Sequence, residues 1–143
     1  MAAVTTVYRF ATSTDPTTIE SRLSSANWPV QVRVNFMMRF KFYREWRADR
    51  HMRGDVEKSP FISVLEDPAK LATSPDPWAR TIATGSPGHP LAQRAPDIGT
   101  FSVPQPRLIY PKPHNLLSTI ETERAFWGNS LAGFLIEWNQ NPY

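Results

Sequence analysis

The stretch that decides the fold is Ser59-Pro60-Phe61-Ile62-Ser63-Val64-Leu65-Glu66-Asp67-Pro68. The apolar residues from Phe61 to Leu65 predict a short strand. Asp67 is a good helix N-cap, Pro68 suits the first position of a helix, and a short helix-forming run follows. The stretch therefore predicts a strand that turns directly into a helix. It places the small hydroxyl of Ser63 near a strand end, where ligands are often held.

Length and composition set the outer limits of the fold. The chain has 143 residues, which fits one domain with one core. Its 14 prolines and six glycines indicate fixed turns and edge strands rather than long helices. The absence of cysteine excludes disulfides and thiolate metal sites. The sequence has no apolar run of about 20 residues, so we expect no membrane span. It also has no signal-peptide pattern, so we expect no leader, and the cytoplasm is slightly favoured as the location of the protein.

Further strands and helices are predicted along the chain. β-Branched and aromatic runs predict strands at Val4 to Phe10, Asp97 to Val103, Leu108 to Tyr110, Glu123 to Trp127 and Gly133 to Trp138. A short helix is expected between residues 16 and 25, and residues 78–84 are either a helix or an extended segment. The sequence therefore predicts a single α+β domain over residues 1–143, with mainly antiparallel strands and short helices.

The clearest periodicity in the chain begins at Val30. Apolar and polar residues alternate from there to Tyr43, which favours a half-buried strand to about Lys41 and a helix from there to about Met52. A competing helical spacing also begins within this segment. The strand interpretation predicts that three side chains point into the core: Phe36, Met38 and Phe40.

The segment 33–53 is basic. It holds seven Lys and Arg residues against two acidic ones, with aromatic residues interleaved. One interpretation is a surface that binds nucleic acid or an acidic protein, with arginines on phosphates and rings on bases. The other is a solvated face whose rings point inward, which the alternation favours. The mild formal charge of +3 gives little support to a dedicated nucleic-acid-binding protein.

Charged residues that could carry chemistry occur at both ends of the chain. Arg9 lies inside an apolar strand, either facing solvent from a sheet edge or aimed into a cleft where it can hold a phosphate or carboxylate. Glu121 and Glu123 are two residues apart, so in an extended segment they share a face. Such a pair is either exposed or able to stabilise a nearby cation.

Other catalytic patterns are missing from the sequence. The three histidines are scattered, without the spacing of metal ligands, so no metal site is expected. No glycine-rich phosphate loop occurs, which argues against nucleotide triphosphatases and Rossmann dehydrogenases. A serine hydrolase would need a nucleophile elbow, and the sequence contains none.

Three short motifs, taken in order, resemble the arginine–serine–glutamate branch of the ADP-ribosyltransferase-like fold. They are Tyr8-Arg9, Ser63 within Phe61-Ile62-Ser63-Val64, and Glu121-Thr122-Glu123. The phrase Ser59-Pro60-Phe61-Ile62-Ser63 is also similar to the middle segment of fungal domains of unknown function assigned to this fold. Where that branch usually has Ser-Thr-Ser, this chain has Ile62-Ser63-Val64.

The resemblance implies a reaction on NAD as substrate. Tyr8 and Arg9 would belong to the NAD-binding set, with Arg9 at the phosphate or ribose side, and Ser63 would orient the nicotinamide ribose. Glu123 would stabilise the oxocarbenium ion as nicotinamide leaves, and Glu121 would deprotonate or position the acceptor. The function implied is that of a glycosyltransferase of the toxin or effector kind, or an NAD glycohydrolase. The alternatives are a non-catalytic module that binds nucleic acid or an acidic protein through segment 33–53, and a structural component of a larger assembly.

Overall fold

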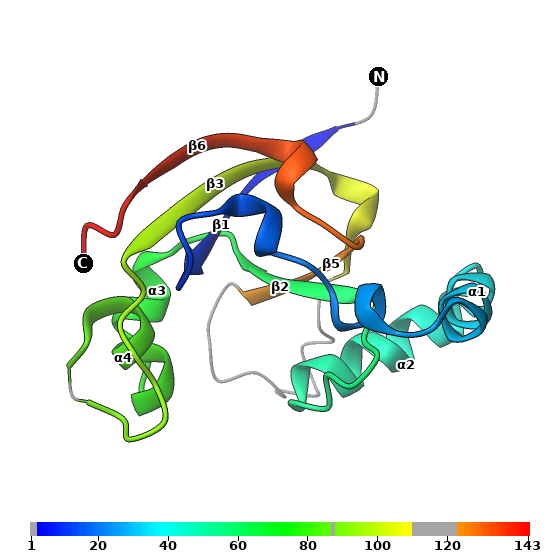
Figure 1. Cartoon of the computed structure of the whole chain (residues 1–143), viewed down its shortest axis with the longest axis horizontal. Helices are drawn as coiled ribbons and strands as arrows, with labels where there is room; N and C mark the ends of the chain where they lie inside the picture. Colours follow the sequence, from blue (N-terminus) through cyan, green and yellow to red (C-terminus); the bar gives the residue numbers. More distant parts are fainter. Residues whose placement is uncertain (1–2, 87, 110–122) are drawn as a thin grey trace.

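Six antiparallel strands form one sheet in the part of the chain that this computed structural model describes, residues 3–86, 88–109 and 123–143 (Figure 1). Their order across the sheet is β4-β5-β2-β1-β3-β6. The strands are β1 Val4–Ala11, β2 Phe61–Leu65, β3 Asp97–Pro104, β4 Leu108–Ile109, β5 Glu123–Trp127 and β6 Leu135–Gln140. Five predicted strands and the strand at Phe61 to Leu65 are thus confirmed as elements, although Tyr110, at the end of one of them, lies outside the described residues. The described part of the chain is a single small α+β domain.

Short helices lie between the strands. The α-helices are α1 Trp28–Met37, α2 Lys41–Met52, α3 Ala69–Ala72 and α4 Pro77–Thr84, and 3-10 turns occupy Pro16–Thr18, Arg22–Ser25, Gln105–Arg107 and Ala132–Phe134. The predicted strand-to-helix turn after Ser63 is confirmed. The helix begins one residue later than predicted, with Pro68 rather than Asp67 at the N-cap of α3, and Asp67 Oδ1 accepts a hydrogen bond of 3.1 Å from the Ala69 amide just before the helix.

The predicted strand from Val30 to Lys41 is wrong, because this segment contains α1. Asn27 caps the helix by accepting a hydrogen bond from the Val30 amide, and a proline occupies its first turn. Burial follows the four-residue helical spacing, with Val34 and Met38 inside the protein. The predicted helix to Met52 is confirmed as α2.

This correction also changes where the aromatic rings lie. Met38 is buried as expected, but Phe36 and Phe40 are 52% and 53% exposed. A strand would have placed all three on one face, whereas a helix turns Phe36 away from the face that Val34 and Met38 bury. The interpretation of segment 33–53 as a solvated face with inward rings is therefore wrong for these two phenylalanines.

Both faces of the sheet carry apolar side chains. One face packs Val7, Ile62, Val64 and Phe126, among others, into a cluster that also includes Phe101 and Leu131. On the other face, α3 and α4 cover Phe10 and Leu65, while α1 and α2 cover Phe61 and Ala125. Figure 1 shows these two helix pairs at opposite ends of the sheet. Ser63 lies on β2 between Phe61 and Leu65, so it faces the space between the two helix pairs.

The two halves of the sheet meet at a narrow junction. β1 pairs with β3 along its whole length, from Val4 to Ala11, and β2 pairs with β5 from Phe61 to Leu65. Between β1 and β2, only Tyr8 and Leu65 are paired. Beyond that pair the two central strands separate, and the backbone of β2 near Ser63 lacks the ladder partner that β1 would otherwise supply.

A pair of matched phenylalanine truncations tests this description of the core. Phe126 is fully buried, so Phe126→Ala should lower the free energy of unfolding by about 3 to 5 kcal/mol. Phe40→Ala should cost less than about 1 kcal/mol, because the ring already contacts solvent. Urea unfolding measures the free energy of unfolding of both variants, provided that each keeps the m-value of the wild type. Equal losses in the two variants would contradict the exposed position of Phe40.

Candidate functional site

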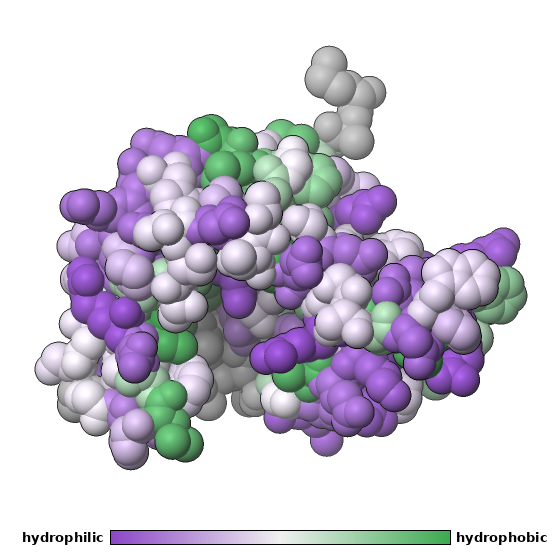
Figure 2. Space-filling model, viewed as in Figure 1, coloured by the Kyte–Doolittle hydropathy of each residue, from purple (hydrophilic) through white to green (hydrophobic). Residues whose placement is uncertain are grey.

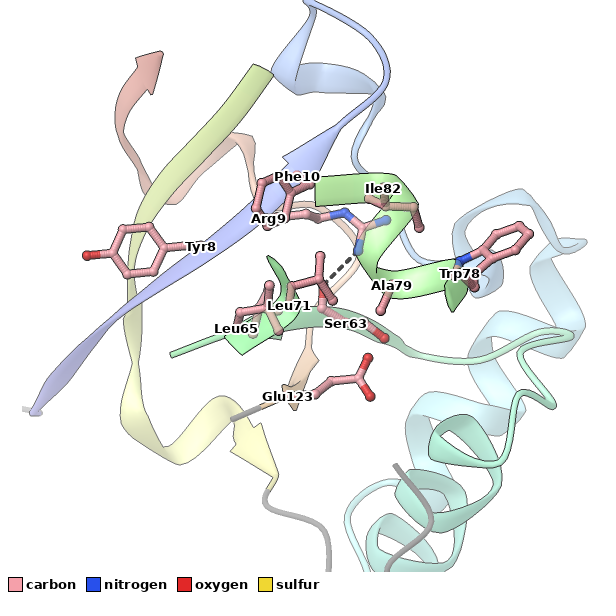
Figure 3. Close-up of a pocket in the computed structure, with 11 residues that line it drawn as sticks. Tyr8, Arg9, Phe10, Ser63, Leu65, Leu71, Trp78, Ala79, Ile82 and Glu123 are labelled. Atoms are coloured by element: carbon pink, nitrogen blue, oxygen red, sulfur yellow. Dashed lines mark hydrogen bonds between the residues drawn. The ribbon is translucent and has the colours of Figure 1, made fainter. Parts of the chain in front are cut away.

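A cavity of about 330 Å³ opens where β1 and β2 separate (Figure 3). Figure 2 shows the surface hollowed between the two helix pairs. The cavity combines an apolar wall, largely from α3 and α4, with three polar side chains. Its lining consists of Tyr8, Arg9, Phe10, Ser63, Val64, Leu65, Leu71, Trp78, Ala79, Ile82 and Glu123.

Arg9 spans the gap between the two central strands. Strand alternation places it with Val7 and Ala11, on the face of β1 opposite Tyr8. The separation of β1 from β2 lets its side chain cross the gap, where Nη1 donates a hydrogen bond of 2.7 Å to the Ser63 carbonyl oxygen. The guanidinium thus satisfies a backbone acceptor and lines the cavity. Arg9 is therefore aimed into a cleft rather than out from a sheet edge.

The electrostatic surroundings of Arg9 have three components. Burial lowers its pKa, the Glu123 carboxylate raises it, and the positive charge of Arg22 lowers it further. A guanidinium stays protonated in proteins despite such effects. The cavity therefore contains a fixed cation beside a carboxylate, with a second cation nearby.

Glu123 reaches the same cavity from β5. It is the antiparallel partner of Leu65, so its side chain shares a face with Leu65 and Ser63. In Figure 3 its carboxylate points into the cavity beside the Ser63 side chain. The next residue fixes the backbone here, because Arg124 donates to the Glu123 carbonyl at 2.8 Å and pairs with Glu66 at 3.3 Å.

The other predicted site residues have different positions. Tyr8 lines the cavity, but its ring points away from the Arg9 guanidinium (Figure 3). Glu121 lies outside the described residues. Arg9, Ser63 and Glu123 are thus the predicted residues whose polar groups the fold brings to one place.

His51 was missed by the sequence reasoning. It lies in the last turn of α2, is buried, and holds two serines at once. Its Nε2 is 2.7 Å from the Ser63 hydroxyl and its Nδ1 is 2.8 Å from the Ser59 hydroxyl. Ser59 Oγ also accepts a hydrogen bond from the Phe61 amide at 3.2 Å. The available signal was the spacing of Ala48, His51 and Met52, which marks the buried face of α2.

The protonation state of His51 limits what it can do. Burial lowers its pKa from 6.5 to about 4, and the positive charge of Arg9 contributes to this shift. The ring is therefore neutral near pH 7, donating through one nitrogen and accepting through the other. Among the described residues its second hydrogen-bond partner is the Ser59 hydroxyl rather than a carboxylate, and a hydroxyl does not stabilise an imidazolium as a carboxylate would. This arrangement orients the Ser63 hydroxyl more than it activates Ser63 as a nucleophile.

The apolar wall suits a flat ring. Trp78 and Ile82 on α4 and Leu71 on α3 line the side facing the polar cluster (Figure 3). Trp78 was another residue that sequence reasoning did not assign to the site. An apolar wall with a few convergent polar groups is the usual composition of a small-molecule site.

Comparisons with protein-family models, with curated proteins and with solved structures find no significant match. Within the described ranges, no three His, Asp or Glu side chains gather as a metal site would require. None of the described helices is long and apolar enough to cross a membrane. The chemistry of the cavity is therefore inferred from its own side chains.

The buried position of His51 predicts a pH-dependent stability. The unfolded chain binds a proton at His51 below pH 6.5, whereas the folded chain does so only near pH 4, so stability falls as the pH falls through this window. The loss attributable to His51 should be about 2 to 3 kcal/mol between pH 7 and pH 4.5. His51→Gln should remove that part of the dependence.

Urea unfolding of both proteins at several pH values measures the effect. Above pH 7 the two proteins should show the same slope of stability against pH, which serves as the internal control. The histidine ring signals in an NMR titration give an independent reading. A His51 ring that titrates near its ordinary pKa in the folded protein would contradict the buried, neutral assignment.

Proposed function

We propose that this chain has an ADP-ribosyltransferase-like fold and cleaves the nicotinamide–ribose bond of NAD. One observation carries the proposal: Arg9, Ser63 and Glu123, which lie on three strands and far apart in sequence, line one cavity. The acceptor is water in an NAD glycohydrolase, or a protein or nucleic-acid group in a transferase. NAD is the substrate in both reactions.

The reaction needs a carboxylate at the sugar. As the bond between C1′ of the ribose and the nicotinamide nitrogen breaks, its electron pair leaves with nicotinamide and positive charge develops on the sugar. The Glu123 carboxylate, fixed on β5 in a half-buried position, is placed to stabilise that charge. The acceptor oxygen or nitrogen then bonds to C1′ and loses a proton. Glu121, as the resemblance implies, would assist that deprotonation.

The remaining cavity residues would orient the dinucleotide. The Ser63 hydroxyl, held by His51, offers a fixed hydrogen bond to a ribose hydroxyl. The apolar wall of Leu71, Trp78 and Ile82 matches the flat nicotinamide ring. Arg9 adds positive charge for the phosphate side of the substrate, with guanidinium donors beyond the one that binds the Ser63 carbonyl.

The decisive experiment is nicotinamide release from NAD by the purified chain. Glu123→Gln keeps the size of the side chain and removes its charge, so it should lower the rate by about 100-fold or more, or roughly 3 kcal/mol in the barrier. Glu137→Gln is the matched control, because Glu137 is exposed on β6 and does not line the cavity. It should leave the rate unchanged.

Two results would count against this proposal. If the wild-type protein binds NAD but releases no nicotinamide, the cavity is a binding site without the reaction. If Glu123→Gln and Glu137→Gln are equally active, the catalytic carboxylate is not Glu123. Thermal unfolding of both variants should show one cooperative transition above the assay temperature, which separates a loss of chemistry from a loss of folding, although Glu123→Gln should unfold at a somewhat lower temperature because it removes a negative charge near Arg9.

A second candidate function is favoured by the exposed rings of α1 and α2. Trp28, Val32 and Phe36 follow a four-residue spacing along α1, and Phe40 and Phe42 lie at the turn into α2; their exposed fractions run from 46% to 82%. Figure 2 shows many hydrophilic side chains over the region of α1 and α2. Exposed rings among arginines and lysines suit a polyanionic partner, either a nucleic acid or an acidic protein.

Salt dependence tests this second function, with single-stranded RNA as the probe. If the surface binds nucleic acid, affinity should fall steeply with salt, and replacing Arg33, Arg39 and Lys41 with Gln should lower the slope of log affinity against log salt by about three. Phe42→Ala should weaken binding by about 1 to 3 kcal/mol without changing the slope, because it removes stacking rather than charge. Fluorescence anisotropy measures both quantities. Binding that does not depend on salt would exclude this function.

A further inference from the structure

The strand β6 is an open edge of the sheet. It stands at one end of the strand order, so β3 pairs with it on one side and no described strand pairs with it on the other (Figure 1). The opposite edge strand, β4, has two residues, whereas β6 has six, five of which are exposed. β6 therefore presents the longer open edge.

The ladder with β3 fixes which backbone groups of β6 point outward. The Asn141 amide donates to the Pro96 carbonyl at 2.8 Å, next to the pair of Gln140 with Asp97. Bonded and non-bonded pairs alternate along an antiparallel ladder, so the N–H and C=O groups of Trp138 and Gln140 point away from β3. Among the described residues, no backbone hydrogen bond reaches these outward groups.

This edge lacks the protection that sheet edges usually have. Natural edge strands avoid pairing by means of lysines, prolines, bulges or short length. From residue 125 to residue 143 the chain has one charged side chain, Glu137, and one proline, Pro142, which follows the strand. A register shift opposite Thr100 and Phe101 lies near the start of β6 and leaves the later residues in regular pairing.

The start of the edge is also apolar. Leu135 and Ile136 are 36% and 59% exposed. Figure 2 shows hydrophobic surface over the region of β6. A partner strand laid along β6 would therefore cover apolar side chains as well as satisfy backbone groups.

Long-range hydrogen bonds hold this edge in place. The buried Asn141 side chain donates through Nδ2 to the Ala83 carbonyl at 2.7 Å and to the Ala95 carbonyl at 2.8 Å. Trp138 Nε1 donates to the Asp97 carboxylate at 3.1 Å. Because β6 is already ordered, little conformational entropy is lost when another strand pairs with it.

We propose that the β6 edge pairs with the β6 edge of a second copy of this chain, antiparallel across a twofold axis. An antiparallel edge is self-complementary, because the outward groups of each copy meet the same groups of the other copy. With Trp138 on the axis, Glu137 lies opposite Asn139 rather than opposite the other Glu137. The inference does not rest on the proposed function.

Charge favours a second copy at β6 over pairing of two copies elsewhere. The chain has a formal charge of +3, and segment 33–53 concentrates seven basic residues, so two copies that met there would repel each other. Two β6 edges bring together one carboxylate from each copy and no lysine or arginine. The β6 edge is thus the place where two copies meet with little electrostatic cost.

The size of the edge predicts a weak dimer. A standard protein–protein interface uses about 20 to 30 residues a side, far more than a strand of six residues provides. We therefore expect a dissociation constant in the micromolar range or weaker, with monomer and dimer in exchange.

Sedimentation velocity of the full chain tests the dimer, over a concentration range of about 5 to 500 µM. The wild type should shift from monomer to dimer as its concentration rises. Ile136→Lys places a charge on the edge and should weaken dimerisation by about tenfold or more. Leu91→Lys is the matched control, because Leu91 is 79% exposed and lies outside β6. It should dimerise like the wild type.

A second variant keeps the test independent of the lysine. The Gln140 amide points away from β3, so Gln140→Pro removes an outward donor without removing a bond of the β3 ladder. It should also weaken dimerisation by about tenfold or more. Thermal unfolding of both β6 variants should show one cooperative transition, since both changes lie on an exposed edge.

Three results would overturn the inference. The first is a wild type that stays monomeric over the whole concentration range, including one that instead binds an extended peptide of another protein at β6. The second is a dimer that both β6 variants retain in full. The third is a dimer that Phe42→Ala disrupts and the β6 variants do not, which would place the contact on α2. Glu123→Gln should dimerise like the wild type, so a failure of the proposed reaction leaves this test unaffected.

Discussion

The hydrogen bond from Arg9 to the Ser63 carbonyl lies at the point where the sheet divides. A buried carbonyl without a partner costs free energy, and the separation of β1 from β2 removes the partner that the ladder would supply. Arg9 replaces that backbone donor with a charge-assisted one at 2.7 Å. The separation can therefore persist in the folded state, and it is this separation that makes room for the cavity. One side chain stabilises the gap and gives the cavity its positive charge.

The two helix pairs complete the enclosure. Because α3 and α4 cover Leu65 while α1 and α2 cover Phe61, Ser63 in the middle of β2 lies between the two helix pairs. A hydroxyl at Ser63 fits that position better than an apolar side chain would, since it faces a polar opening. His51 extends from α2 to hold this hydroxyl, and Ser59 holds His51 in turn. The packing that stabilises the domain thus also orients the polar cluster.

The packing of the domain also leaves α1 incompletely covered. Val34 and Met38 bury one side of the helix against the body of the protein, whereas Trp28 and Phe36 on the other side stay 75% and 52% exposed. Exposed rings of this size are costly in water unless a partner covers them for part of the time. The surface next to them is basic. The domain therefore carries two independent features that point to function, the cavity at the strand junction and the outer face of α1 and α2.

The sequence by itself determined the strands, the turn after Ser63, and the presence of Arg9 and Glu123 on strands. These features depend on local alternation, on capping residues and on proline, all of which act within a few positions. It misassigned α1, because alternating valines fit a strand locally while the burial of Val34 and Met38 depends on tertiary contacts.

Only the tertiary structure decided which polar groups meet. His51 contacts a serine 12 positions away, and Arg9 contacts a carbonyl 54 positions away, so no local pattern could pair them. The separation of β1 and β2 and the reach of Arg9 across it both depend on how distant strands pack. Local sequence sets the propensity of each segment, but the positions of charged side chains relative to one another follow from the packing of the whole domain.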